Sequence, residues 1–582
     1  MTVSEYIFHF FEEHGVDTVY MVSGSSAMWL TDALKRNEKL SAVCCQHEQA
    51  AAMAADAYGR TTGKPGVSLV TVGPGATNAM TGVAGAYVDS SPMFVLSGQS
   101  NSRLLEYQIS TGVRQKGTQS LNLEPLTAGI TKYFAVVMSE SDIRYHMERA
   151  WFMATDGRKG PVWLDVPVDI QNRQVPENMR AFEPEERHSE CIPYGRIRSA
   201  LAEAKKPLIL AGYGVSSAAV CDDMLEFAER FQIPVVTSRG GIGCINSDHP
   251  LFVGRPGSYG DRASHFAIQS CDFLLVLGSR LSASTIGYYP ESFGKNAYKV
   301  FVDVDDRELA REDIPIDLKI CADLGIFMPE LNHRSETEKW AVQPHATWVE
   351  KCATDRKRYP VVLDSYRYED KLNAYIFTEI LSRSAPENAT IVVDTGSVCN
   401  VVSQTWNLKR GQKYIISGGL SSMGFWASAI GACAAGGSVF ALSGDGSTQM
   451  NIQEFATLRY YRFPIKLFVY NNKGYLLIRH NQHNYMNDRF LGVGEDSGVP
   501  SIDFCAVATA YGLPCVRIEK GDDVEGKVRQ VLKTDGPVIC EVMTQEFGIL
   551  APRIASRVMP DGSLKAAEFD DLWPFLKEAE KP

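Results

Sequence analysis

Residues 444–472 read GDGSTQMNIQEFATLRYYRFPIKLFVYNN, and this stretch decides the fold of the chain. The apolar run SVFALSG leads into the Gly-Asp-Gly turn, a helical pattern follows, and a second apolar run, IKLFVY, ends at Asn471 and Asn472. This order predicts a strand, a helix and a second strand parallel to the first. Because the crossover in such a unit is right-handed, both strands end at one edge of the sheet. We therefore expect Asp445 and Asn472 to converge.

The two converging side chains carry oxygens that suit a magnesium ion. Carboxylate, amide and carbonyl oxygens are hard ligands, and Mg²⁺ completes its octahedral shell with phosphate oxygens and water. The flanking glycines allow a phosphate to approach the backbone at the start of a helix. An Asp in a surface turn and an Asn pair closing a strand are the alternative. The turn, the helix and the Asn pair in combination favour the metal and phosphate site.

Apolar runs alternate with helical patterns in three successive blocks of the chain. Two polar links, PENMRAFEPEERHSECIPYG at 176–195 and NHRSETEKWAVQPHATW at 332–348, separate the blocks. Short strands that end in glycine and are joined through helices are typical of doubly wound parallel sheets. We therefore predict an α/β fold with three doubly wound parallel-sheet domains, whose ligands bind beyond the carboxyl ends of the strands.

The composition limits the classes of partner. The chain has 582 residues, 45% hydrophobic and 22% charged, as in ordinary multidomain globular proteins. Its net charge of −11 is spread without a basic block, so neither nucleic acid nor a membrane surface is an expected partner. The first residues, MTVSEYIFHFFEEHG, lack the basic start of a signal peptide and favour an amphipathic helix.

Two further features bear on location. The 13 cysteines follow neither metal-ligand spacing nor the pattern of a secreted disulfide framework, which favours a cytoplasmic location. Residues 421–442 are uncharged and long enough to be considered as a membrane span. Their Gly, Ser and Ala content, and the GDG turn that follows, favour a buried helix and strand instead.

With these motifs in place, the chain resembles the thiamine-diphosphate-dependent enzymes, in their acetolactate synthase branch. HEQAAAMAADAYGRTTGKPGVSLVTVGPGATN, KPLILAGYGV, LGSRL, GGLSSMGF and the GDG–NN stretch carry the similarity over nearly the whole length. The resemblance implies a pyrimidine-binding domain in residues 1–180, a central domain in 190–335, a diphosphate-binding domain in 365–560 and a tail in 561–582. It also implies a homodimer as the smallest active unit, with a homotetramer left open.

The resemblance assigns roles to individual residues. The side chains of Asp445 and Asn472 and the carbonyl of Gly474 would hold Mg²⁺. Met423 would be the apolar wedge that bends thiamine diphosphate, and the carbonyl of Ser421 would accept from its exocyclic amine. The remaining residues that the resemblance places in the cofactor site are Gly24, Ser25, Glu48, Pro74, Asn78, Thr395, Gly396, Ser397, Gly444, Gly446, Ser447, Tyr475 and Leu476.

The resemblance gives Glu48 the central catalytic role, in activation of the cofactor. Its carboxyl would bond the aminopyrimidine nitrogen and favour the imino tautomer, whose nitrogen removes the thiazolium proton. An acidic residue opening an Ala-rich helix is also favoured by the helix dipole without any chemistry, and Met423 could be ordinary core packing. The combined pattern favours the catalytic roles. Asn78 either caps its helix or faces substrate.

Whether the central domain holds FAD stays open. The acetolactate synthase family binds a flavin there, near positions that Gly212, Arg280 and Asp303 match, but relatives without flavin keep similar residues. A bound FAD would be structural, because the reaction needs no net redox step. The run GYGVSS from Gly212 lacks the third glycine of a dinucleotide fingerprint, so a nicotinamide dehydrogenase is the weaker alternative.

The implied reaction is decarboxylation of a 2-oxo acid, with pyruvate the expected donor, and addition of the remaining two-carbon unit to a carbonyl acceptor. Departures from the family concern the acceptor. Where the family has an Asp-Ala-Phe-Gln-Glu run, KGTQSLN keeps Gln119, a candidate catalytic and substrate residue, but loses the acidic and aromatic neighbours. Arg479 and His480, further candidate substrate residues, stand about where a Trp is usual. Arg479 would either pair with an anionic acceptor or be structural. A decarboxylase that releases an aldehyde, a diketone C–C hydrolase or lyase, and a silent cofactor-binding paralogue are the alternatives. The presence of Glu48, Asp445, Asn472 and Met423 argues against silence.

Overall fold

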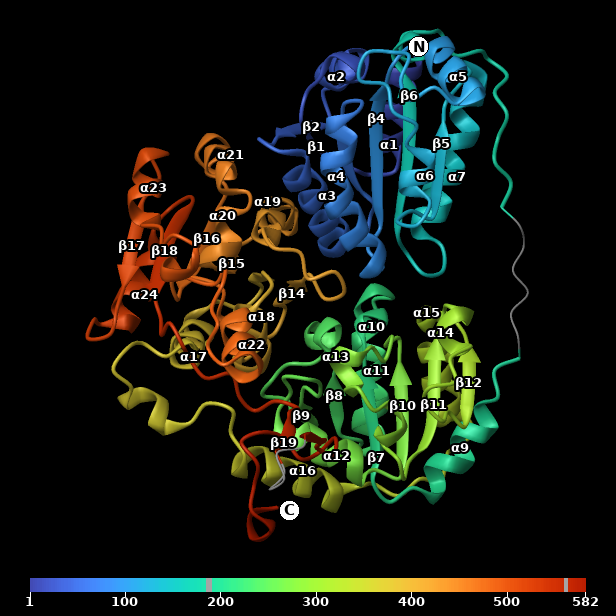
Figure 1. Ribbon diagram of the computed structural model, residues 1–582. Helices are drawn as coiled ribbons and strands as arrows, with labels where there is room; N and C mark the ends of the chain where they lie inside the picture. The colour runs from blue at the N-terminus through green and yellow to red at the C-terminus, as the bar shows by residue number, and fades with distance from the viewer. Residues whose placement is uncertain (185–190, 559–563, 582) are drawn as a thin grey trace.

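The computed structural model describes residues 1–184, 191–558 and 564–581 and contains three six-stranded sheets (Figure 1). Every neighbouring strand pair within these sheets is parallel. The predicted α/β fold with three doubly wound parallel-sheet domains is thereby confirmed. The domain limits given above remain a prediction.

The first sheet has the order β2-β1-β3-β4-β6-β5. Its strands are β1 (Thr18–Met21), β2 (Ser41–Cys44), β3 (Gly66–Val70), β4 (Met93–Gln99), β5 (Tyr133–Val136) and β6 (Pro161–Pro167). The helices around it are α1 (Val3–Glu13), α2 (Met28–Arg36), α3 (Glu48–Thr62), α4 (Pro74–Val88), α5 (Ser102–Thr111), α6 (Glu124–Thr127), α7 (Ile143–Thr155) and α8 (Val168–Gln171).

The second sheet has the order β12-β11-β10-β7-β8-β9. Its strands are β7 (Pro207–Ala211), β8 (Val235–Thr237), β9 (Phe252–Gly254), β10 (Phe273–Leu277), β11 (Tyr298–Asp303) and β12 (Leu318–Cys321). The accompanying helices are α9 (Tyr194–Glu203), α10 (Tyr213–Ser217), α11 (Cys221–Phe231), α12 (Arg262–Ser270), α13 (Ala283–Ile286), α14 (Asp306–Leu309), α15 (Leu324–Thr337) and α16 (Ala346–Arg358).

The third sheet has the order β14-β13-β15-β16-β18-β17. Its strands are β13 (Thr390–Val393), β14 (Lys413–Ile416), β15 (Val439–Gly444), β16 (Ile465–Asn471), β17 (Cys515–Ile518) and β18 (Val538–Met543). Its helices are α17 (Ala374–Ser384), α18 (Ser397–Thr405), α19 (Ala429–Ala432), α20 (Asp445–Gln449), α21 (Phe455–Tyr461), α22 (Leu476–Met486), α23 (Phe504–Ala510) and α24 (Val524–Lys533). Near the C-terminal end of the chain, β19 (Ser556–Val558) pairs antiparallel with β20 (Leu564–Ala566).

The quoted stretch forms the predicted strand–helix–strand unit, with one difference. β15 pairs parallel to β16 from Val439 opposite Ile465 to Gly444 opposite Tyr470. The connecting helix is interrupted: α20 ends at Gln449, and the 3₁₀ helix η8 (Ile452–Glu454) begins after Asn451. Asn451 has φ of 85°, a left-handed conformation that Asn tolerates better than most residues and that no helix continues through.

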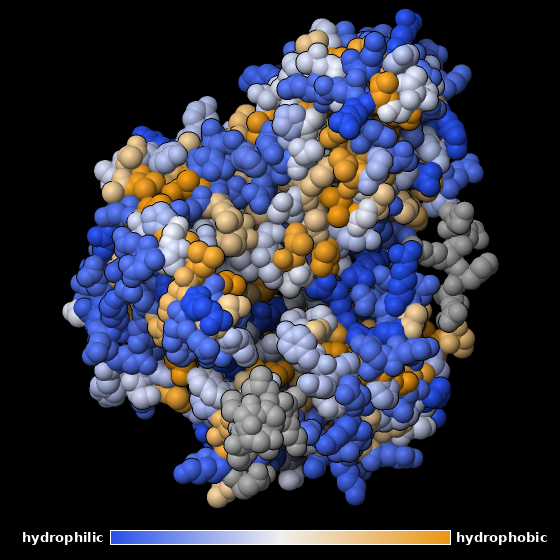
Figure 2. Space-filling model, in the orientation of Figure 1, coloured by the Kyte–Doolittle hydropathy of each residue, from blue (hydrophilic) through white to orange (hydrophobic). Residues whose placement is uncertain are grey.

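Residues 421–442, considered above as a membrane span, form short helical turns and a strand. These are the 3₁₀ helix η6 (Phe425–Ser428), α19, the 3₁₀ helix η7 (Cys433–Ala435) and the first part of β15. No helix within the described ranges is long and apolar enough to cross a membrane. On the face in Figure 2, polar residues cover most of the surface, with apolar patches between them.

Helix α3 of the first domain packs against α19 of the third (Figure 1). One apolar core contains side chains from both, among them Ala51 and Ala54 of α3 and Trp426 and Ile430 of the third domain. The backbones come so close that a Cβ on Gly431 would lie 1.7 Å from the carbonyl oxygen of Ala54. The Ala-rich sequence of α3 therefore serves a close interdomain contact.

Candidate active site at the ends of the third sheet

The structure brings the predicted metal ligands Asp445 and Asn472 to adjacent strand ends. Asp445 follows β15, and Asn472 follows β16, its neighbour in the sheet. Both are buried, with 6% and 4% of their surfaces exposed. The N–H of Gly474 donates to Oδ2 of Asp445 at 2.7 Å, so the turn after Asn472 folds back over the Asp. The strand ends that carry the two residues are thus neighbours, as the strand order predicts.

The donor set fits a hard cation. Within the described part of the chain, the buried Oδ1 of Asn472 has no hydrogen-bond partner. Burial raises the pKa of Asp445 to about 7, against the opposing effect of its backbone hydrogen bonds. A buried carboxylate and a buried amide oxygen that lacks a donor are both stabilised by a cation between them.

Glycine shapes the same site at two positions. A Cβ on Gly446 would lie 2.1 Å from the ring of Tyr475, which therefore packs directly on this glycine. Gly474 has φ of 139°, and a Cβ there would lie 2.0 Å from the carbonyl oxygen of Val493. Side chains would block the approach of Tyr475 to the turn at Gly446 and of the 493 loop to Gly474.

A second predicted group, Thr395 to Ser397, starts helix α18 beside the metal residues. Gly396 has φ of 82°, and no side chain in the described part of the structure caps the N-terminus of the helix. Ser397, Asn472 and Leu476 line one small cavity of about 20 Å³. Uncapped N–H groups at a helix start are suited to a phosphate.

Met423 and Ser421 lie on the loop before η6. Met423 is half-buried and is not among the residues that form the described cores, so packing does not account for it. The N–H of Gly424 donates to Oγ of Ser447 at 2.8 Å, which ties this loop to the turn after Asp445. Ser421 has φ of 55°. The loop and the predicted phosphate turn are therefore neighbours.

Asp394 is a residue whose importance the sequence reasoning missed. It is fully buried after β13 and accepts the N–H groups of Thr395, Phe425 and Trp426 at 2.7, 3.2 and 3.2 Å, and the hydroxyl of Ser443 at 2.9 Å. Burial raises its pKa. One carboxylate thus fixes the loop with Thr395, the loop after Met423 and strand β15. The run TIVVDTGS holds the same signal as the GDG turn, an Asp at the end of a buried strand.

Glu48 and the other predicted first-domain residues form a separate group. Asn78 Nδ2 donates to Oε2 of Glu48 at 3.0 Å. Thr71 joins this group, because Cβ atoms on Gly24 and Gly75 would lie 2.3 and 2.8 Å from its side chain. Ser25 and Pro74 begin the 3₁₀ helix η1 (Ser25–Ala27) and α4 in the same region. Gln119 packs its backbone on Gly73, just before Pro74.

No hydrogen bond or ion pair among the described residues joins Glu48 or Asn78 to Asp445 or Asn472. The expectation that the two groups meet across a subunit interface stays a prediction.

Arg479 and His480 contact backbone carbonyls. The Arg479 guanidinium donates to the carbonyl oxygens of Lys473 and Val493 at 2.9 and 3.0 Å, and also to that of Glu546. His480 Nε2 lies 2.9 Å from the carbonyl oxygen of Gly548. These contacts favour a structural role for Arg479 over pairing with an anionic acceptor.

Arg479→Met should therefore act on stability. Leaving the carbonyls without a charged donor is expected to lower the free energy of unfolding by about 2 kcal/mol, while the KM of any acceptor changes less than about threefold, the effect of a residue that makes no substrate contact. Denaturant unfolding and steady-state kinetics measure the two. A large rise in acceptor KM at unchanged stability would instead assign Arg479 to substrate binding.

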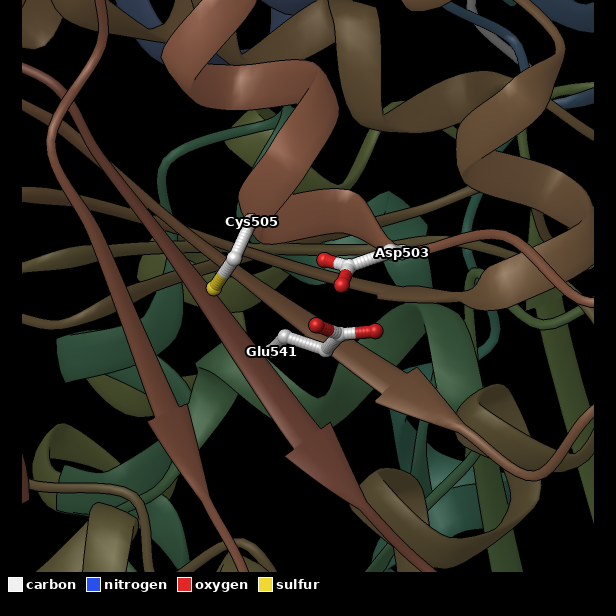
Figure 3. A group of neighbouring side chains, drawn as sticks. All are labelled: Asp503, Cys505 and Glu541. Atoms are coloured by element: carbon white, nitrogen blue, oxygen red, sulfur yellow. The ribbon is translucent and has the colours of Figure 1, made fainter.

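An acidic cluster beside the site does not require a metal. The carboxylates of Asp503 and Glu541 face one another near Cys505 (Figure 3). Arg517 donates to Glu541 at 2.8 Å and lies 2.5 Å from Asp503, so one guanidinium pairs with both carboxylates. Asn471 Nδ2 donates to Glu541 at 2.7 Å, so this network holds the residue next to Asn472.

Cys505 also departs from the sequence expectation. It forms a disulfide with Cys515, which spacing alone did not indicate.

A cavity of about 510 Å³ lies where the three domains meet. Arg280 and Asp303 line it, as do Tyr213 and Gly214, which follow the predicted Gly212. A Cβ on Gly212 would lie 2.1 Å from the carbonyl oxygen of Gly278, so glycine lets two strand-end turns approach. Burial raises the pKa of Asp303 to about 6. The three residues predicted near a flavin thus lie in or beside one large cavity.

Comparison with known proteins gives matches in all three domains. The family models "Thiamine pyrophosphate enzyme, N-terminal TPP binding domain", "central domain" and "C-terminal TPP binding domain" match residues 1–124, 195–331 and 394–542. The large subunit of acetolactate synthase isozyme 2 from Escherichia coli (strain K12) is 29% identical, over 95% of this chain and 97% of its own. The chloroplastic acetolactate synthase of Arabidopsis thaliana is 30% identical, over 94% and 82%. The large subunit from Lactococcus lactis is 29% identical, over 96% and 95%.

Proposed function

Because the chain belongs to the thiamine pyrophosphate enzymes, we propose that it transfers a two-carbon unit from pyruvate to a carbonyl acceptor. The observation that carries the proposal is the pair of buried residues Asp445 and Asn472 at adjoining strand ends, where Oδ1 of Asn472 has no hydrogen-bond partner among the residues described. The relatives named acetolactate synthase support pyruvate as the donor.

Thiamine diphosphate, when bound, supplies the nucleophile and the electron sink for loss of CO₂ and formation of the new C–C bond. In the proposed site, the side chains of Asp445 and Asn472 and the carbonyl of Gly474 would hold Mg²⁺. The N-terminus of α18 and the turn at Ser447 would bind the diphosphate. Met423, which is half-buried, would contact the cofactor from the loop before η6.

Glu48 is proposed to hold a proton at the aminopyrimidine ring nitrogen. Its partner Asn78 donates to one carboxylate oxygen, which leaves the other for the cofactor. Because Glu48 and the magnesium residues belong to different groups within one chain, we propose that the active unit is a homodimer, or a homotetramer made of two, in which one subunit supplies each group.

FAD is proposed as a structural ligand of the cavity at the three-domain junction. Support comes from the cavity's volume and from Arg280 and Asp303 in its lining. The visible spectrum of purified protein reconstituted with FAD tests this: retained flavin absorbance after gel filtration supports it, and complete loss contradicts it. We also propose a cytoplasmic location, because the 13 cysteines do not follow the spacing of a secreted disulfide framework.

The deciding experiment measures CO₂ release from pyruvate by protein loaded with thiamine diphosphate and Mg²⁺, with products identified by mass spectrometry. CO₂ together with acetolactate or a larger adduct would establish a carboligase. CO₂ with free acetaldehyde would mean a decarboxylase. No turnover despite tight cofactor binding would contradict pyruvate as donor and direct the search to diketones or longer 2-oxo acids.

A further inference from the structure

Glu454 is a fully buried carboxylate for which the proposed function has no role. It ends η8 in the third domain and is 0% exposed. Its Oε1 accepts the backbone N–H groups of Gln46 and His47 at 2.9 and 3.0 Å. Both residues belong to the first domain and immediately precede Glu48. Its Oε2 accepts the hydroxyl of Thr457 at 2.6 Å, so the carboxylate is itself held in place.

The hydrogen bonds reach the loop that sets where Glu48 lies. His47 is the N-cap of α3, and its Nδ1 accepts the N–H of Gln49 at 3.1 Å. Glu48 therefore stands between a residue whose N–H is fixed by Glu454 and one whose N–H is fixed by His47. Because these N–H groups are hydrogen-bonded, the chain enters the helix in one defined backbone conformation.

The rest of α3 is also attached to the third domain. Its middle lies on Gly431, as described above. Near its C-terminal end, Arg60 Nη1 donates to the carbonyl oxygen of Ile416 at 2.8 Å. Glu454 is the attachment at the N-terminal end, where Glu48 is.

We propose that Glu454 is a positioning residue for Glu48, because it anchors the two N–H groups that precede this residue and so fixes the direction of its carboxyl. The inference rests on the role proposed for Glu48. The anchoring group lies in the same connection, between β15 and β16, that carries Asp445 and Ser447. The segment proposed to bind the diphosphate thus also holds the helix that presents the catalytic carboxyl.

The electrostatics of Glu454 agree with an anchoring role. Burial raises its pKa to about 7, while the hydroxyl of Thr457 and the N–H groups of Gln46 and His47 oppose that rise. The carboxylate is therefore stabilised by the donors that it orients.

The test compares Glu454→Gln with Tyr461→Phe. The Tyr461 hydroxyl accepts the N–H of Cys44 at 2.8 Å, so the control removes another interdomain hydrogen bond to the same strand and loop. In Glu454→Gln apoprotein, amide hydrogen exchange at Gln46 and His47 should rise about tenfold or more, the result of losing a charge-assisted acceptor. In Tyr461→Phe the rise should be confined to Cys44.

Once loaded with thiamine diphosphate and Mg²⁺, the two variants should also differ in turnover. Glu454→Gln should lower kcat by about tenfold to 100-fold, the scale of a misplaced catalytic group, with the affinity for thiamine diphosphate changed less than about threefold, because no cofactor contact is lost. Tyr461→Phe should keep kcat within about threefold for the same reason. Glu454→Asp keeps a carboxylate on a shorter side chain, so it should partly restore both the slow amide exchange at Gln46 and His47 and the kcat. It replaces Glu454→Gln in the test if the Gln variant does not fold.

Unchanged exchange at Gln46 and His47 in Glu454→Gln, or a kcat equal to that of Tyr461→Phe, would overturn the inference. Its failure is distinguishable from failure of the proposed function. If Glu48→Gln has low turnover while Glu454→Gln is normal, only the positioning role is wrong. If Glu48→Gln is fully active, the role of Glu48 itself is wrong, and the positioning role falls with it.

Discussion

Glu48→Gln should lower turnover of pyruvate by about 100-fold or more, because a positioned proton transfer contributes a factor of this size. The amide cannot hold the proton that the carboxyl of Glu48 is proposed to hold at the aminopyrimidine nitrogen. Cofactor binding should remain close to that of the parent, since the residues proposed to bind the diphosphate and the metal lie in the third domain. Stopped-flow or steady-state CO₂ assays, with calorimetric titration of thiamine diphosphate, measure both quantities.

The matched control is Gln46→Ala. This residue is two positions away with an exposed side chain, and its hydrogen bond to Glu454 uses the backbone N–H, which the substitution keeps. Its turnover should stay within about twofold, as for surface substitutions without a functional contact. Near-normal turnover in Glu48→Gln would refute the catalytic assignment, and equal losses in both variants would point to the helix start as a whole.

Asp445→Ala should abolish the Mg²⁺-dependent binding of thiamine diphosphate. The substitution removes the one carboxylate of the proposed ligand set, so we expect the dissociation constant in the presence of Mg²⁺ to rise by about 100-fold or more, as when a buried charge loses its partner. Titration of the cofactor at fixed Mg²⁺, followed by tryptophan fluorescence, measures the change.

Asp503→Asn is the control for the metal assignment. Asp503 is the exposed acid of the cluster in Figure 3, and Arg517 pairs with it. Its loss should leave cofactor affinity within about threefold, since surface ion pairs contribute little. A parent-like affinity in Asp445→Ala, or a greater loss in Asp503→Asn, would move the metal site from the GDG turn to this cluster.

The local part of the site could be predicted from sequence, and the distant part could not. Asp445 and Asn472 were placed because a strand–helix–strand unit fixes its own geometry. The break at Asn451 was missed because helical periodicity continues through it. The carbonyl groups that Arg479 contacts belong to loops at Val493 and Glu546. No local sequence pattern predicts which carbonyl groups of a distant loop will face a given side chain.

Two buried acids show the same limit. Asp394 follows a strand as Asp445 does, but its partners at Phe425 and Trp426 come from a different loop. Glu454 occurs within the quoted stretch itself, yet its partners lie 408 and 407 positions away. Periodicity marks which residues are buried, whereas tertiary structure decides what a buried carboxylate binds.

The docking of α3 on α19 bears on how chains of this kind can be recombined. The first and third domains share one apolar core, whereas nearly all of the central domain's core side chains come from residues 194–352. A chimera that exchanged only the first or only the third domain would bring together an α3 and a Gly431 surface from different proteins. Those two surfaces would have to fit each other as closely as they do here. Exchange of the central domain would leave that contact intact. In such recombination the outer two domains should be inherited together, whereas a foreign central domain would have to match the contacts by which Ile242 joins the third domain's core.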